Sequence, residues 1–288
     1  VDTTSVHLAA SVLNYIGYDA AVLGNHDIET GFPVFDRWKR DCNFNVLGAN
    51  IVLNEPSSTS VYGNSYTLFE RKNMKIAVIG MITEAIPAWL PENLWKGLSF
   101  TSIEEKAKKL IPHIQKKHHP DFIIGVFHSG VKSSEVAGFK ENVTMEVAQR
   151  VPGFDVIFCG HDHTPFCEKI VNVAGDSVLI VNPGAHAKMI SDVSIRATMK
   201  SGKLVKATVT GQLDTIASIE PDKKYMTHFA EAYQKTKEYV DAEIGEFTQT
   251  ISAREGFFGS SAFIDLLHSL QLKLTKADIS LTAPLSMD

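Results

Sequence analysis

The sequence has little of several features that would indicate a function directly. It has three cysteines among 288 residues and no Cys-x-x-Cys pair, which argues against a disulfide framework and a cysteine zinc site. No apolar run reaches the roughly 20 residues that a membrane-spanning helix needs. The formal net charge of −5 gives no reason to expect a nucleic-acid polymer or an anionic membrane as the main partner. The composition, 44% hydrophobic, is that of an ordinary globular protein.

The sequence also lacks the marks of complete ends. It begins at Val1 instead of Met and enters a helical pattern almost at once, and it stops at Asp288 directly after a strand-like run. We therefore expect truncation at both ends. Because the true start is missing, the lack of a signal peptide does not indicate a cytosolic protein.

Strands and helices alternate through most of the chain. Continuous apolar runs at residues 20–23, 122–127 and 156–159, the last within a strand expected at 155–159, are typical of strands that are covered on both faces. Amphipathic patterns predict helices, and turn signals between alternating runs predict hairpins. The helices are expected at 3–16, 33–41, 102–117 and 142–151, and the hairpins at 66–82, 168–181 and 192–211. This order predicts an α/β fold, a four-layer α/β/β/α sandwich.

Three segments follow from this pattern. Residues 1–220 are expected to form the sandwich domain, without its N-terminal part. Residues 221–245 are charge-rich and helical, and we interpret them as a connector. Residues 246–288, with a helix at 260–273 and a strand at 278–282, are expected to open a second α+β domain.

Polar residues follow the first apolar strand, in the stretch Gly24-Asn25-His26-Asp27-Ile28-Glu29. In open α/β sheets, ligands bind at the carboxyl ends of the strands. Asn25 offers a neutral oxygen ligand, and His26 can hold or give a proton. Glu29 is three residues later and can accept a hydrogen bond from the ring of His26. The same residue types also make ordinary turns, so a structural interpretation stays open for this stretch alone.

Two later strands end in the same way, at His128 and at His161-x-His163. On an extended segment, His161 and His163 point to one side, so they can serve one metal ion or two adjacent ions. Neutral imidazole suits zinc, manganese, iron or cobalt. A pair of such ions would clamp two phosphate oxygens. The histidines at the strand ends therefore predict a metal centre.

One component of such a centre is missing. Two adjacent metal ions need a bridging carboxylate, and none is obvious at a strand end. Asp27 and Asp162 are next to candidate ligands, and we expect both to point away. His186 receives no role. Trp89 and Trp95 lie in a stretch, 87–97, that is expected to be irregular, and packing is favoured over stacking on a base for both.

These residues carry a family resemblance. The blocks Gly24-Asn25-His26-Asp27, His128-Ser129-Gly130 and Gly160-His161-Asp162-His163 resemble, in order and spacing, three blocks of the calcineurin-like metallophosphoesterases. Ala49-Asn50-Ile51, the connector helix and Phe258-Gly259-Ser260-Ser261 resemble the 5′-nucleotidase family within them. His128-Ser129-Gly130, residues 89–98 and residues 278–284 look more like the branch of 2′,3′-cyclic-nucleotide 2′-phosphodiesterases/3′-nucleotidases.

The resemblance implies two divalent metal ions, zinc, manganese or similar. Asn25, His128 and His161 would bind one ion, and His163 would bind the other. His26 would stabilise the transition state or protonate the leaving oxygen, with Glu29 orienting it. The family's upstream Asp-x-His and Gly-Asp blocks have no counterpart here, so the chain as given is expected to hold an incomplete site.

The leading hypothesis is an enzyme that hydrolyses phosphate esters of nucleotides, with the 2′,3′-cyclic-nucleotide and 3′-nucleotidase activities favoured. The alternative substrate assignment is a 5′-nucleotidase or UDP-sugar hydrolase. An alternative of another class is a non-catalytic binding scaffold on the same fold, which the missing carboxylate suggests. A periplasmic or cell-surface location is implied by resemblance alone, and the sequence does not give the metal, the base preference or the oligomeric state.

Overall fold

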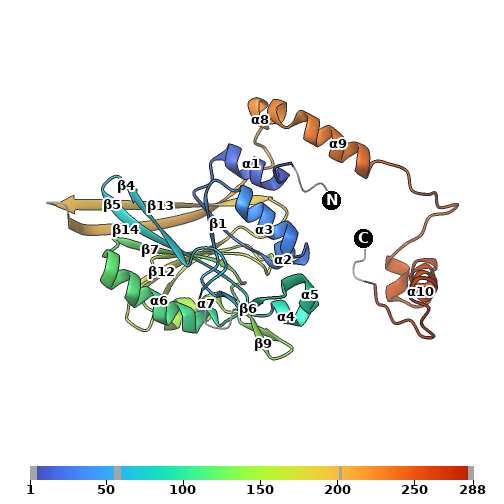
Figure 1. The fold of residues 1–288 in the computed structure, drawn as a ribbon, viewed down its shortest axis with the longest axis horizontal. Helices are drawn as coiled ribbons and strands as arrows, with labels where there is room; N and C mark the ends of the chain where they lie inside the picture. Colours follow the sequence, from blue (N-terminus) through green and yellow to red (C-terminus); the bar gives the residue numbers. More distant parts are fainter. Residues whose placement is uncertain (1–4, 55–59, 201–202, 285–288) are drawn as a thin grey trace. The chain divides into compact units, whose positions relative to one another are not determined.

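The structure of the protein is a computed structural model that describes residues 5–54, 60–200 and 203–284 (Figure 1). The chain divides into two compact units, residues 1–220 and residues 221–288. Within the described part of the chain, none of the helices is both long and apolar enough to cross a membrane.

The first unit is built on a six-stranded sheet. Its strands, in spatial order, are β11 (Phe166–Val171), β12 (Ser177–Asn182), β10 (Val156–Cys159), β7 (Phe122–His128), β5 (Met74–Ile82) and β4 (Tyr66–Arg71). The four central strands are parallel, and the two edge strands are antiparallel to their neighbours. The carboxyl ends of the parallel strands therefore lie along one edge of this sheet.

Helices α6 (Ile103–His118) and α7 (Thr144–Arg150) cover one face of this sheet (Figure 1). Apolar residues of α6, spaced by three or four positions, are buried against β5 and β7. The Oγ of Ser102 accepts a hydrogen bond from the backbone N–H of Glu105 and caps the helix, as Ser at this position commonly does. The predicted helix at 102–117 is confirmed.

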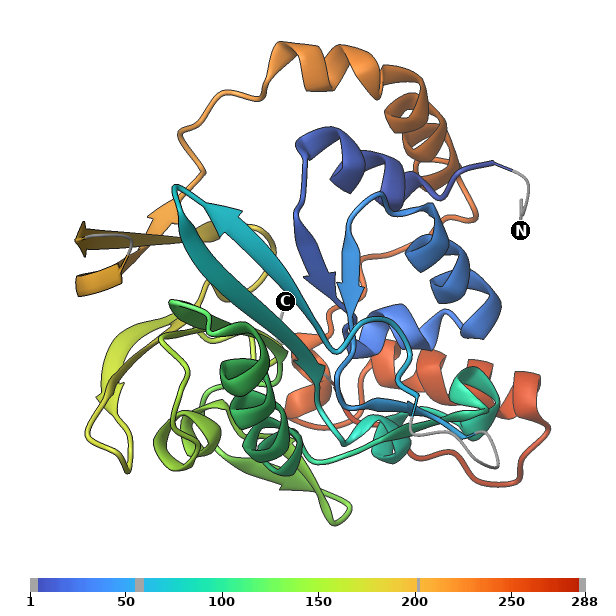
Figure 2. The ribbon, with the colours of Figure 1, turned by 60° about the vertical axis from the view of Figure 1, so that its left-hand side comes forward.

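The opposite face of the sheet packs on a second β layer. The hairpin of β13 (Met189–Lys200) and β14 (Lys203–Thr215) contributes the apolar side chains that contact β10 and β12. The parallel pair β1 (Ala20–Val22) and β2 (Asn45–Leu47) also faces the sheet, and α1 (Leu8–Ile16) and α3 (Phe32–Asp41) cover the pair (Figure 2). The predicted α/β sandwich is confirmed.

Several short elements differ from the sequence prediction. The Asn-His segment is the helix α2 and not a turn, and the stretch predicted to be irregular contains two short helices. Two small antiparallel pairs were not predicted. These elements are α2 (Asn25–Glu29), α4 (Ile86–Trp89), α5 (Glu92–Trp95), the pair β3 (Ile51–Leu53) and β6 (Leu98–Phe100), and the pair β8 (Ser134–Val136) and β9 (Phe139–Asn142). Elements of three to five residues are too short to show a hydrophobic period.

Two predictions fall partly on residues outside the described ranges. The helix expected at 3–16 is described from Leu8, and residues 1–4 are not covered. Its end is as expected, because Gly17 adopts a left-handed conformation, with φ of 87°, and caps the helix. The polar, turn-rich stretch 54–64 predicts a loop, and part of it lies at residues 55–59, which are also not covered.

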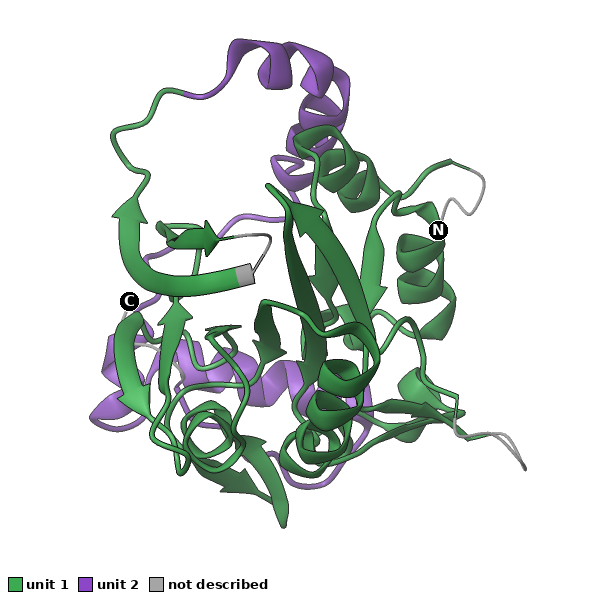
Figure 3. Cartoon of the chain, turned by 90° about the vertical axis from the view of Figure 1, so that its left-hand side faces the viewer, with its two compact units in different colours: residues 1–220 green, residues 221–288 purple. Residues whose placement is uncertain are grey.

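The second unit is mostly helical (Figure 3). Within the connector the sequence predicts one helix at 222–243, and this is wrong, because α8 (Lys223–His228) and α9 (Ala230–Val240) are separate helices that meet at Phe229. Neither helix buries a residue, and at the junction the ring of Phe229 contacts the rings of Tyr225 and His228. A short 3₁₀ turn, η1 (Arg254–Phe257), precedes α10 (Ala262–Thr275), which the Oγ of Ser261 caps.

The strand expected at 278–282 is also wrong. Residues 278–284 of the described chain form no strand. A strand needs a neighbour for its backbone hydrogen bonds, and the described part of the second unit contains no other strand. The segment is held to α10 by side chains, since the Oγ of Ser280 lies 2.8 Å from Nδ1 of His268.

Candidate functional site

The segment after β1 turns into α2 and carries Asn25 and His26. Gly24 is the N-cap of this helix, and its backbone N–H donates to Oδ2 of Asp27 at 2.7 Å. Burial raises the pKa of Asp27, while this hydrogen bond acts against the rise. The carboxylate of Asp27 thus caps the start of the helix, and the expectation that it points away from the candidate ligands is confirmed.

Three predicted ligands from three elements converge on one point. Oδ1 of Asn25, on α2, lies 2.7 Å from Nε2 of His128, the last residue of β7. The same oxygen lies 3.3 Å from Nδ1 of His161, which follows β10. The rings of the two histidines have their centroids 5.1 Å apart. The sequence separations are 103 and 136 residues, so only the fold brings these atoms together.

His26 pairs with Glu29 as expected. Nδ1 of His26 lies 2.7 Å from Oε2 of Glu29, and both residues belong to α2. The side chain of His26 is 79% exposed. Because the carboxylate can only accept, Nδ1 of His26 carries the hydrogen in this contact.

His163 makes a ring contact with a further histidine. Its ring faces that of His186, with centroids 6.2 Å apart. The expectation of an extended His161-Asp162-His163 segment is wrong, because φ is 89° at His161 and 57° at His163. Positive φ is strained for histidine, and such strain is concentrated at functional sites.

Asp162 holds this strained turn in place. Its Oδ2 accepts from the backbone N–H of Val131 at 2.8 Å, and its Oδ1 accepts from Nδ2 of Asn182 at 2.7 Å and from the backbone N–H of Thr164 at 3.2 Å. The carboxylate is therefore committed to the scaffold, and the expectation that it points away from the ligands is confirmed.

Two glycines of the predicted blocks allow close approach. A Cβ on Gly24 would lie 2.9 Å from Cε1 of His128, and a Cβ on Gly130 would lie 2.5 Å from Cβ of Asp162. Neither space admits a methyl group. In contrast, a Cβ on Gly160 would meet nothing within 4 Å.

Glu141 is a site residue that the sequence did not predict. Its Oε1 lies 3.0 Å from Nε2 of His161, and it belongs to the unpredicted strand β9. Trp89 contacts the same imidazole, with ring centroids 5.2 Å apart. Trp95 donates from Nε1 to the backbone oxygen of Leu90, and both tryptophans pack against a buried cluster, so the packing interpretation is confirmed.

The surroundings keep His128 neutral. Burial, with smaller contributions from the neighbouring histidines His161, His26 and His163, lowers the pKa of His128 to about 3. A metal ligand must present a neutral imidazole. His128 therefore meets this requirement at neutral pH.

The donor set fits part of a metal site. In the ranges that the structure describes, no group of three or more His, Cys, Asp or Glu side chains is arranged to hold a metal ion. The converging set has two histidines and one asparagine, whose neutral nitrogen and oxygen atoms are borderline ligands for a divalent ion. Three donors can bind one ion together with further ligands, but they supply no anionic bridge for a second.

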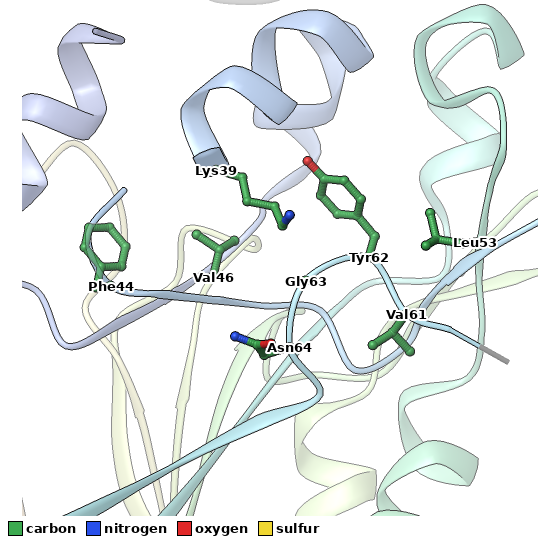
Figure 4. A pocket seen from close by; sticks show the side chains of 8 residues that line it. All are labelled: Lys39, Phe44, Val46, Leu53, Val61, Tyr62, Gly63 and Asn64. Carbon is green, nitrogen blue, oxygen red and sulfur yellow. The ribbon is translucent and has the colours of Figure 1, made fainter. Parts of the chain in front are cut away.

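A separate pocket of about 360 Å³ lies beside α3 (Figure 4). Lys39 lies over the ring of Tyr62 in this pocket, with Nζ 4.8 Å from the ring centroid. The hydroxyl of Tyr62 donates to Asp36 at 3.0 Å. The predicted site residues are not among the described residues that line it.

Residues 2–165 match the family model of the calcineurin-like phosphoesterases. The match spans more than half of the chain and includes all three histidine blocks. The chain therefore belongs to the calcineurin-like phosphoesterase family, as the sequence resemblance predicted, and members of this family depend on metal ions.

Individual relatives agree with this assignment. The chain is 25% identical over 270 residues to the trifunctional nucleotide phosphoesterase protein YfkN of Bacillus subtilis, covering 88% of this chain and 18% of that protein. It is 24% identical to the 2′,3′-cyclic-nucleotide 2′-phosphodiesterase/3′-nucleotidase of Haemophilus influenzae, covering 96% of this chain and 45% of that protein. The chain thus spans less than half of the length of either relative.

A solved structure shows the same fold. The putative 5′-nucleotidase of Staphylococcus aureus superposes with a TM-score of 0.74 at 20% identity, covering 96% of this chain and 55% of that one. The architecture is therefore that of a calcineurin-like phosphoesterase.

Proposed function

We propose that this chain carries part of the active site of a metal-dependent phosphoesterase that hydrolyses nucleotides. The observation that carries the proposal is the convergence of Asn25, His128 and His161 on one point, from three separate elements. Family membership supports the reaction class, and the names of the relatives support nucleotide substrates.

In this proposal, Asn25, His128 and His161 hold one divalent metal ion, and His163 serves a second. Divalent ions lower the pKa of the attacking water and neutralise charge on the phosphoryl oxygens. The neutral state of His128 favours binding. The remaining ligands, including an anionic bridge, come from outside the described set.

The proposed role of His26 is proton transfer to the leaving oxygen. Glu29 fixes the hydrogen on Nδ1, so that a proton held at the exposed Nε2 can be given to the ester oxygen as it departs. His26→Gln is expected to lower kcat by about 10²–10⁴-fold. Glu29→Gln, which keeps an acceptor, is expected to lower it less.

We favour 2′,3′-cyclic-nucleotide and 3′-nucleotide substrates. Two relatives that align along 88% and 96% of this chain are a trifunctional nucleotide phosphoesterase and a 2′,3′-cyclic-nucleotide 2′-phosphodiesterase/3′-nucleotidase. A 5′-nucleotidase or UDP-sugar hydrolase is the second candidate. In line with these relatives, we propose that residues 246–288 begin a nucleotide-binding domain after the connector at 221–245. We also propose that the protein acts in the periplasm or at the cell surface.

The test is metal content and phosphate release, measured on the natural full-length protein. We expect two metal ions per chain, and hydrolysis of 2′,3′-cyclic AMP and 3′-AMP faster than of AMP or a UDP-sugar. The control is Asn25→Ala, which is expected to lose metal and activity together. A full-length protein that binds no metal and hydrolyses none of these substrates would favour the scaffold alternative.

A further inference from the structure

The pair formed by Glu141 and His161 is not explained by the family blocks. Oε1 of Glu141 lies 3.0 Å from Nε2 of His161, the ring nitrogen opposite the one that faces Asn25. The side chains of His161 and Glu141 are only 11% and 27% exposed. The contact is therefore a partly buried pair and not a loose surface contact.

We infer that Glu141 is a positioning residue that fixes the tautomer and the orientation of His161 for metal binding. This inference rests on the proposed function. A neutral imidazole has one donor and one acceptor nitrogen, and a carboxylate only accepts. Glu141 therefore places the hydrogen on Nε2 of His161. The lone pair of Nδ1 then points to the place where Oδ1 of Asn25 and Nε2 of His128 converge.

A β-bulge in the hairpin of β8 and β9 sets the direction of the Glu141 carboxylate. Ser134 pairs with Asn142 and Glu135 pairs with Lys140, so Glu141 is the extra residue of a β-bulge. A bulge turns its side chain away from the regular alternation, and bulges are frequent next to active sites. The unusual direction of the Glu141 side chain therefore has a backbone cause.

Further hydrogen bonds fix Glu141 at its second carboxylate oxygen and at its backbone. Ser134 Oγ donates to Oε2 of Glu141 at 3.0 Å, and Ser129 Oγ donates to the backbone oxygen of Glu141 at 3.1 Å. The next residue, Asn142, accepts from the backbone N–H of Gly130. The bulge is thus tied to the His128-Ser129-Gly130 block, so the carboxylate and His128 are held by one network. Partners that orient a metal-binding histidine through its second nitrogen are a general feature of metal sites.

The first test measures the tautomer of His161 directly. Long-range ¹H–¹⁵N correlation spectra of the metal-free 288-residue chain at pH 8, with ¹⁵N-labelled histidine, report which nitrogen of each ring carries the hydrogen. His161→Gln identifies the His161 signals. We expect the Nε2–H form in the wild type and in Glu141→Gln, which keeps the acceptor, and a mixture in Glu141→Ala. An unchanged tautomer in Glu141→Ala would overturn the inference.

The second test measures metal affinity by chelator competition with Zn²⁺, with the same substitutions made in the natural full-length protein. Glu141→Ala is expected to weaken the affinity by about 10–100-fold, as loss of an orienting partner does. Glu141→Gln is expected to stay within about 3-fold of the wild type. An equal loss in both variants would mean that Glu141 ligates the metal itself, which contradicts a positioning role. Glu135→Ala removes an exposed carboxylate of the same hairpin and is the matched control.

The two proposals fail separately. If the natural full-length protein binds no metal but the tautomer still depends on Glu141, the proposed function falls and the positioning of His161 stands. If metal and nucleotide hydrolysis are present but neither the tautomer nor the affinity responds to Glu141→Ala, the positioning role falls alone.

Discussion

Gly24→Ala tests whether the fit around His128 controls the site. The backbone of Gly24 is extended, with φ of −103° and ψ of 170°, so alanine can adopt it without strain. The new Cβ would lie 2.9–3.1 Å from three ring atoms of His128, whereas ordinary van der Waals contact begins at 3.4 Å. The substitution therefore acts through the imidazole and not through the backbone.

The size of the effect follows from these distances. The ring of His128 must move by about 0.5 Å to relieve the contact, which lengthens the 2.7 Å approach of Nε2 to Oδ1 of Asn25. Displacements near 1 Å at a reacting centre cost about 100-fold in rate, so we expect about 10–100-fold loss of phosphate release. Overpacking of this kind costs about 1–3 kcal/mol of stability.

The assay compares Gly24→Ala with Gly160→Ala. A Cβ on Gly160 meets nothing within 4 Å, although this glycine is next to His161. Zinc affinity, circular dichroism and phosphate release are measured for both variants in the natural full-length protein. We expect Gly24→Ala to keep its fold and lose affinity and rate, and Gly160→Ala to match the wild type. Equal behaviour of the two variants would refute the reasoning.

Two further predictions concern aspartates of the scaffold. Asp162→Ala removes three hydrogen bonds that hold the strained turn, so we expect the free energy of unfolding, measured by urea denaturation, to fall by about 2–4 kcal/mol. The control is Asp192→Ala, which removes an exposed carboxylate and is expected to leave this free energy unchanged. Burial, with a smaller contribution from Asp176, raises the pKa of Asp155 from 3.8 to about 6. The native state therefore binds the carboxyl proton more tightly than the unfolded state does, and the free energy of unfolding falls as pH rises from about 4 to 6. Asp155→Asn keeps an acceptor for the backbone N–H of Ile123 and removes the carboxylate, so above pH 6 it should be more stable by up to about 3 kcal/mol, with no gain below pH 4. A stability difference that does not change between pH 4 and 7 would contradict this.

Long periodic segments were predictable from the sequence. The hairpin strands β4 and β5 have the predicted ends, and α6 is shifted by one residue. Their apolar residues recur at the period of the element, and local capping or turn residues mark the limits. The second unit was predicted less well, because its connector helices bury no side chains and its expected strand has no partner in the described chain.

The sequence by itself also determined which residues end the buried strands, and thus the candidates Asn25, His128 and His161. Parallel strands bring their carboxyl ends to one edge, which is why three distant blocks meet. It also indicated the pairing of His26 with Glu29, because residues three apart on a helical turn are neighbours.

Only the tertiary structure decided how these side chains are arranged. The positive φ of His161 and His163 depends on hydrogen bonds that Asp162 accepts from Val131 and Asn182, which no local pattern reveals. Glu141 reaches His161 because a bulge in a short hairpin turns it there, 20 residues away in sequence. Hydrophobic periodicity fixes which face of an element is buried, but atoms that meet across the fold are positioned by packing and by non-local hydrogen bonds.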